Sequence, residues 1–296
     1  MLNRVTNLTM STTAQRTLQA QQSKLAQLQE KATTLNKISR PSDDPAATAK
    51  ALETRSLLAA TAQYGRNIDD GNSWLTAADS ALEQATNVMH RVKDLMVLAG
   101  NGSLSKSGKD AIALELDALN KDLVSIANSK HLGRNIFAGS SDASAAFSNS
   151  MPPDFKGAGV SPVDRRISAT QTVRVDADGQ TIFGSGTDSV FNSIKSVADS
   201  LRGGTAPKSS QLGDVEDRFN SIVDGRAEVG TRQAQLERAG NVNTELEAAL
   251  DAQRTGIEKA DLGSVIMDLK LQETNYQVAL AATARVLQPT LMDFLR

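Results

Sequence analysis

A repeat of apolar and small residues every 3.5 positions constrains the fold of this chain more than any other feature. Between residues 68 and 99 the steps alternate between three and four without interruption. The repeat comprises Ile68, Gly71, Leu75, Ala78, Leu82, Ala85, Met89, Val92, Met96 and Ala99. This spacing places all of them on one face of an α-helix and is typical of a coiled-coil seam. We therefore predict a helix about 48 Å long, at 1.5 Å per residue, that packs on another helix.

Two further helices are predicted before this repeat, separated by a break at residues 40–45. Residues 11–38 carry one apolar stripe, whose largest members are Leu18, Leu25, Leu28 and Leu35. Asp44 is suited to cap the next helix, because its carboxylate can accept free backbone N–H groups. Pro45 is suited to be the first helical residue, where its missing N–H has no cost. A short helix is expected from Ala46 to about residue 63.

Helical spacing returns after residue 100 and again after Ser209. The seam at residues 112–126 follows a short loop, so its helix is expected to lie antiparallel to the one before it. A long seam then runs from Leu212 through Val242 and Leu246 to Ile257. After a break near Asp261, the last seam comprises Ile266, Leu269, Tyr276, Leu280, Leu287 and Phe294.

The segment of residues 136–206 differs from both helical flanks, because it holds five of the seven phenylalanines and many Gly and Ser residues. Residues 172–176 alternate with period two, and the pair Asp178-Gly179 follows before Thr181-Ile182-Phe183. An Asp-Gly pair between such runs predicts a tight β-hairpin. The segment is therefore expected to be a β-rich outer domain inserted between helices.

The expected fold is mainly α: the N- and C-terminal segments form a nested long helical coiled-coil bundle with the β-rich domain inserted. The predicted domains are terminal helices at residues 1–42 and 262–296, a helical rod at 43–135 and 207–261, and the outer domain at 136–206.

Composition and motifs argue against an enzyme, so no catalytic, cofactor-binding or metal site is expected. The chain has no cysteine and only two histidines, His90 and His131, each beside a predicted seam. A net charge of −2 gives no reason to expect nucleic acid as a partner. No run approaches the roughly 18 apolar residues of a membrane span, so membrane insertion is not expected, and the polar N-terminus does not resemble a cleaved signal peptide.

Two segments resemble a phosphate-binding loop and a calcium-binding loop, but neither has the residue types and spacing that such a site requires. Residues 102–109 have five residues between the glycines of a would-be phosphate loop, and Asp110 stands where Ser or Thr is needed. Residues 176–179 resemble the start of a calcium loop, but Thr187 falls where a bidentate Glu is required.

Three sequence segments resemble one family. The segment Arg40-Pro41-Ser42-Asp43-Asp44-Pro45, preceded by Ile38-Ser39 and followed by Ala46, is similar to the signature of the hook-associated protein 3 (FlgL) family of flagellin-like proteins. The segment Gly133-Arg134-Asn135-Ile136-Phe137-Ala138-Gly139 resembles the family's Gly-Arg-aromatic-Phe-Gly segment, with Asn135-Ile136 departing from the usual aromatic. The ending from Asn275 to Arg296 resembles the C-terminus that flagellins and junction proteins share.

This resemblance implies a structural subunit that joins the hook of the bacterial flagellum to its filament. It implies terminal helices in an inner coiled-coil layer, self-association in a ring or helical stack, and contacts with flagellin and an adjacent hook-associated protein. It also implies an extracellular location, reached by flagellar type III export without a cleaved signal, and a chaperone that holds the C-terminal helix. The predicted assembly interface consists of the terminal seam residues Leu18, Leu25, Leu28, Leu35, Ile266, Leu269, Tyr276, Leu280, Leu287 and Phe294.

Two other functions stay open on sequence alone. A flagellin of the filament itself is the nearest, although flagellins usually lack the Pro-Ser and second Pro of the residue 40–45 motif. A coiled-coil adhesin or phage-tail-like binding protein is the alternative of another class, and it would not require the two ends to pair.

Overall fold

The structure is a computed structural model that describes residues 2–100, 104–157 and 161–287, with side chains described from residue 9 to residue 285 within these ranges. The chain forms two compact units. The terminal unit consists of Met1–Ala60 and Glu247–Arg296, and the central unit consists of Thr61–Leu246. Helices α2 (Pro45–Ala99) and α6 (Ser209–Glu258) contribute residues to both units.

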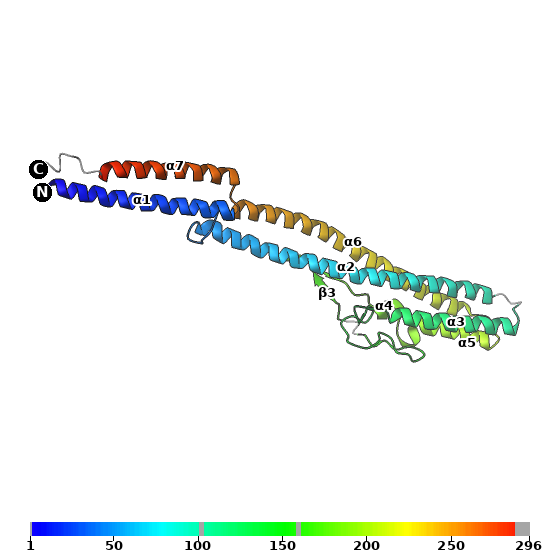
Figure 1. Ribbon diagram of the computed structural model, residues 1–296. Helices are drawn as coiled ribbons and strands as arrows, with labels where there is room; N and C mark the ends of the chain where they lie inside the picture. Colours follow the sequence, from blue (N-terminus) through cyan, green and yellow to red (C-terminus); the bar gives the residue numbers. More distant parts are fainter. Residues whose placement is uncertain (1, 101–103, 158–160, 288–296) are drawn as a thin grey trace. The chain divides into compact units, whose positions relative to one another are not determined.

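In the terminal unit, helix α1 (Leu2–Thr34) packs along helix α7 (Leu262–Leu287) in the antiparallel direction (Figure 1). Neither helix can bury its apolar stripe alone, and the packing of one stripe on the other partly removes both from water. The chain leaves α1 at Leu35, which has a left-handed backbone with φ of 54°. Two backbone hydrogen bonds then join the loop to the end of α6, from Lys37 N to the Glu258 carbonyl (2.7 Å) and from Ala260 N to the Leu35 carbonyl (2.9 Å).

The central unit is built on the seam of residues 68–99, and the prediction for this seam is confirmed. All ten repeat residues are buried, and all those from Leu75 onward are at most 2% exposed. All of them except Gly71 belong to one hydrophobic core with residues of α3 (Lys106–Ala127), α5 (Val190–Arg202) and α6. The prediction of a short helix that ends near residue 63 is wrong, because α2 runs unbroken from Pro45 to Ala99.

The predicted β-hairpin at residues 172–183 is wrong, and a β-rich domain is not evident in the described residues. Strand β4 (Thr172–Arg174) pairs with β3 (Asp164–Arg166) upstream, and not with residues 181–183. Residues 179–183 form the short helix α4 (Gly179–Phe183). Asp178 caps this helix by accepting the Gln180 backbone N–H (3.0 Å), so the Asp-Gly pair starts a helix and does not make a turn.

The remaining strands and the 3₁₀ helix within residues 136–206, or just before them, are short. Strands β1 (Lys130–His131) and β2 (Arg134–Asn135) pair with each other, and η1 (Gly186–Asp188) is a single 3₁₀ turn. The longest element between residues 136 and 206 is helix α5, so this segment is partly helical.

The phenylalanines of residues 136–206 belong to the main core of the central unit. Phe137, Phe147, Phe183 and Phe191 are each 0% exposed, and the Phe147 ring centroid lies 5.2 Å from that of Phe191 and 5.3 Å from that of Phe155. These rings form part of the same cluster of buried residues as the α2 seam. The segment therefore shares its hydrophobic core with the helices of the central unit.

Candidate assembly surface

The contact between α1 and α7 is a heptad seam on both helices. On α1 it comprises Ser11, Ala14, Leu18, Gln21, Leu25, Leu28 and Ala32, all half-buried, while almost every other side chain described on this helix is exposed. On α7 it comprises Val265, Leu269, Gln272, Tyr276, Ala279 and Thr283. Both series step by three and four, as antiparallel coiled coils require.

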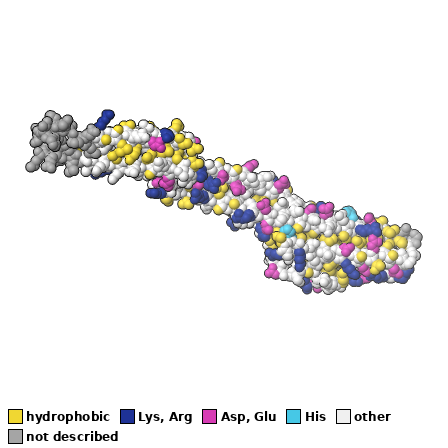
Figure 2. All heavy atoms as spheres, in the orientation of Figure 1, with side chains coloured by type: hydrophobic (Ala, Val, Ile, Leu, Met, Phe, Trp, Pro, Cys, Tyr) yellow, Lys and Arg dark blue, Asp and Glu magenta, His cyan; other side chains and the backbone are white. Residues whose placement is uncertain are grey.

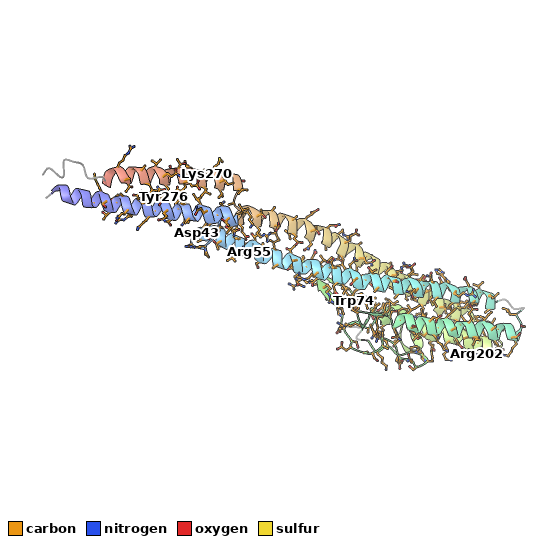
Figure 3. All side chains as sticks on the ribbon, viewed as in Figure 1. Asp43, Arg55, Trp74, Arg202, Lys270 and Tyr276 are labelled. Atoms are coloured by element: carbon orange, nitrogen blue, oxygen red, sulfur yellow. The ribbon has the colours of Figure 1, made fainter. Side chains whose placement is uncertain are left out.

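The structure brings together five of the predicted interface residues in this seam. Leu18, Leu25 and Leu28 face it from α1, and Leu269 and Tyr276 face it from α7, where Figure 3 labels Tyr276. Leu35 is half-buried in the loop after α1. Their role in contacts between subunits stays a prediction.

The other predicted interface residues lie elsewhere. Ile266 and Leu280 lie outside the seam series of α7, and they are 45% and 42% exposed. Each is the neighbour of a seam residue, Val265 or Ala279, and in both pairs the smaller apolar side chain is the more buried one. The side chain of Leu287 and the whole of Phe294 lie outside the described residues.

A second heptad series runs along the opposite side of α7, and sequence reasoning missed it. This outer stripe comprises Met267, Leu271, Thr274, Val278, Ala281 and Arg285, all exposed. Met267, Leu271 and Val278 are 70%, 62% and 62% exposed. At 3.6 residues per turn, Leu271 points about 160° away from Leu269. Figure 2 shows hydrophobic side chains gathered over α7. The sequence signal that could have revealed this stripe is its spacing, because its residues follow the same steps of three and four as the seam.

An exposed apolar stripe on a helix is typical of a surface that another protein covers. The central pair of large residues on this stripe, Leu271 and Val278, lies one heptad apart. The stripe is therefore a candidate surface for contacts between subunits.

The family motif at residues 40–45 shapes the loop between α1 and α2. The Asp43 carboxylate accepts the backbone N–H groups of Ser39 (3.3 Å) and Arg40 (2.9 Å). The Asp44 carboxylate accepts the Ala47 N–H (2.9 Å) and caps α2, which begins at Pro45 as predicted. The side chains of Arg40, Pro41 and Ser42 are exposed. The described contacts of the two aspartates thus give them a structural role.

An ion pair joins α2 to the end of α6 beside this loop. Arg55 Nε donates to Glu258 Oε1 at 2.6 Å, and Figure 3 labels Arg55. This hydrogen bond lowers the pKa of the Glu258 carboxyl and raises the pKa of the Arg55 guanidinium. Because the pKa of Glu258 is lower in the folded chain, the pair stabilises the fold at neutral pH and weakens as the pH falls through that pKa.

We expect Asp44→Ala to lower the free energy of unfolding of the terminal unit by about 1 kcal/mol, because the cap of α2 is lost. Asp44→Asn, which keeps an acceptor oxygen, is expected to retain most of the stability. Urea denaturation followed by circular dichroism measures the difference. Equal stability of the Ala and wild-type chains would contradict the capping role.

The described residues offer little that could carry out chemistry. No group of three or more His, Cys, Asp or Glu residues within them could hold a metal ion. His131 lies against Trp74 with ring centroids 5.3 Å apart, and His90 packs against Phe219 at 4.9 Å. Trp74 is 4% exposed and belongs to the hydrophobic core of the central unit. No helix in the described part of the chain is long and apolar enough to cross a membrane.

Two family models match most of the chain. The bacterial flagellin N-terminal helical region matches residues 5–142, and the bacterial flagellin C-terminal helical region matches residues 204–295. Paired helical ends of this type define the class: a flagellin-like structural protein.

Individual relatives indicate which group of flagellin-like proteins this chain resembles over most of its length. Flagellar hook-associated protein 3 of Salmonella typhimurium is 24% identical over 283 residues, which cover 87% of this chain and 89% of that protein. Flagellin C of Vibrio cholerae is 35% identical over only 82 residues, or 28% of this chain and 22% of that protein. The crystal structure of Bacillus cereus FlgL shares the fold with a TM-score of 0.59 and 22% identity, covering 69% of this chain and 99% of that one. The chain belongs to the flagellin-like family, and it matches the hook-associated protein 3 (FlgL) group over most of its length.

Proposed function

We propose that this chain is the structural subunit that joins the hook of the bacterial flagellum to the filament. The observation that carries the proposal is the extent of the similarity to hook-associated protein 3, which covers 87% of this chain and 89% of that protein. The match to flagellin C of Vibrio cholerae covers only 82 residues and 22% of that protein, so it gives less support to a role in the filament itself.

In this proposal, subunits associate through the terminal helices into a ring or helical stack. The terminal segments, residues 1–42 and 262–296, form the inner layer of the assembled structure. Residues 43–135 and 207–261 form the layer around it, and residues 136–206 face outward. The exposed outer stripe of α7 supports the proposal, because its apolar side chains would be removed from water by a neighbouring subunit. Contacts between unlike surfaces of successive subunits would build the stack.

The proposed partners are further copies of this chain, flagellin on the filament side and another hook-associated protein on the hook side. We also propose export through the flagellar type III apparatus without a cleaved signal, to an extracellular position at the hook–filament junction. An export chaperone would hold the C-terminal helix beforehand. The apolar character of both faces of α7 supports this part, since such a helix needs a cover before assembly.

Deletion of the gene tests the proposed position in the flagellum. We expect the deleted strain to assemble hooks, to lack attached filaments and to shed flagellin into the medium, as seen by electron microscopy and immunoblotting. Expression of the wild-type chain from a plasmid is expected to restore filaments. Retention of attached filaments, or absence of flagellin from both cells and medium, would contradict the proposal.

A further inference from the structure

Helix α7 has two faces of similar character, and only one of them packs on α1. The seam face contains Val265, Leu269, Tyr276 and Ala279 among its six heptad positions, and the outer stripe contains Met267, Leu271, Val278 and Ala281. Both faces have the same steps of three and four. Apolar burial alone therefore gives α1 little reason to select the seam face, since the two faces offer comparable apolar area.

The two faces differ near the middle, where the seam has Gln272 and the outer stripe has Thr274. Gln272 is only 8% exposed, and its Nε2 group donates to the backbone carbonyl of Gln21 (3.3 Å) and to the Gln21 side-chain oxygen Oε1. Gln21 is itself the central seam residue of α1. A buried carboxamide is costly without a hydrogen-bonding partner, so each glutamine favours the pairing that supplies one.

We propose that the Gln21–Gln272 pair determines which face of α7 packs on α1. Rotation of α7 to present its outer stripe would leave Gln21 facing Thr274 or an apolar side chain, without the carboxamide that it now meets. A polar residue at one seam position specifies pairing in coiled coils in the same way, at some cost in stability. The pair thereby keeps Met267, Leu271 and Val278 exposed, and only this last consequence for assembly rests on the proposed function.

Engineered disulfides in the full-length chain can report the packed face, because the natural sequence has no cysteine. Because the helices are antiparallel, one heptad before Gln21 on α1 lies at the same level as one heptad after Gln272 on α7. Ala14 is therefore expected to lie opposite Ala279. The variant A14C/A279C therefore reports the seam face, and A14C/V278C reports a rotated helix at the same level. Only facing cysteines reach the short Cβ separation of a disulfide. The intramolecular product is measured on non-reducing gels at low protein concentration.

In the natural background, we expect the 14–279 disulfide to form at least about tenfold faster than the 14–278 disulfide. Gln21→Leu makes the α1 seam apolar through its centre and leaves Gln272 without its partner. We expect this change to lower the ratio of the two rates by about tenfold. The control Gln22→Leu changes an exposed neighbour outside the seam and is expected to leave the ratio unchanged.

A second variant keeps the test decisive if Gln21→Leu reduces helix content in circular dichroism. The double variant Q21K/Q272E replaces the amide pair by another complementary polar pair, and we expect it to preserve the natural ratio. An unchanged ratio in Gln21→Leu, a natural ratio near one, or loss of the preference in Q21K/Q272E would each overturn the proposal. These readouts come from the purified chain, so they stand whether or not the deletion strain behaves as the proposed junction function requires.

Discussion

Cells that produce the Leu271→Asp chain are expected to lose motility and filament attachment while the purified chain folds normally. Leu271 is 62% exposed on the outer stripe, so a carboxylate there stays hydrated in the free subunit. If a neighbouring subunit covers the stripe, the same carboxylate is buried without a partner, which costs several kcal/mol. Thermal unfolding of the purified chain and swimming in soft agar measure the two effects.

Leu280→Asp tests the residue that sequence analysis assigned to the interface. Its side chain is exposed as well, so the free chain is again expected to be little affected. Gln277→Asp, at another exposed position of α7, serves as the matched control and is expected to leave motility unchanged. Secretion of each variant is measured separately, because the same helix is proposed to bind an export chaperone. Normal swimming of Leu271→Asp cells, with normal secretion, would show that the outer stripe is not an assembly surface.

Phe147→Ala is expected to lower the free energy of unfolding of the central unit by about 3–5 kcal/mol. The Phe147 ring is fully buried and contacts the rings of Phe155, Phe183 and Phe191, so truncation leaves a cavity at the centre of the aromatic cluster. The single tryptophan, Trp74, lies in the same unit and is buried, so its fluorescence can follow unfolding in urea.

The matched control is Leu114→Ala on α3. Leu114 is 70% exposed, and its loss is expected to change stability by less than about 0.5 kcal/mol. A loss below about 1 kcal/mol in Phe147→Ala would contradict the shared core, because it would mean that the aromatic cluster adds little to the helices.

The predicted domains do not coincide with the two units of the structure, because residues 136–206 lie within the central unit. The prediction separates residues 136–206 because their composition differs from that of the flanking helices. Composition records which residues a segment has, but not which other segment covers them. The phenylalanines of this segment belong to the same cluster of buried residues as Leu82 and Leu116, which are distant in sequence. The three-domain division remains a proposal for the assembled flagellum.

The sequence by itself determined the elements whose signal is local and repeated. The seam of residues 68–99 has ten matching positions, so no single ambiguous residue could change its assignment, and all ten are buried. The start of α2 was also predictable, because the Asp44 cap and Pro45 act within one helical turn. The family assignment rested on short motifs of the same local kind.

Only the tertiary structure decided which of two neighbouring residues on a helix is buried. In α6 the heptad from Leu236 continues to Asn243 and Leu250, which are 9% and 8% exposed, whereas the predicted Val242 is 63% exposed. In α7, the face of α1 that packs on the helix decides that Val265 is buried and Ile266 is exposed. The same contact buries Gln272, although apolar residues lie next to it in the sequence. Hydrophobicity alone favours Val242 over Asn243 and the larger Ile266 over Val265, although Asn243 and Val265 are the buried residues. A buried polar side chain becomes favourable only when another element supplies its hydrogen bond, as Gln21 does for Gln272, and that partner lies 251 residues away.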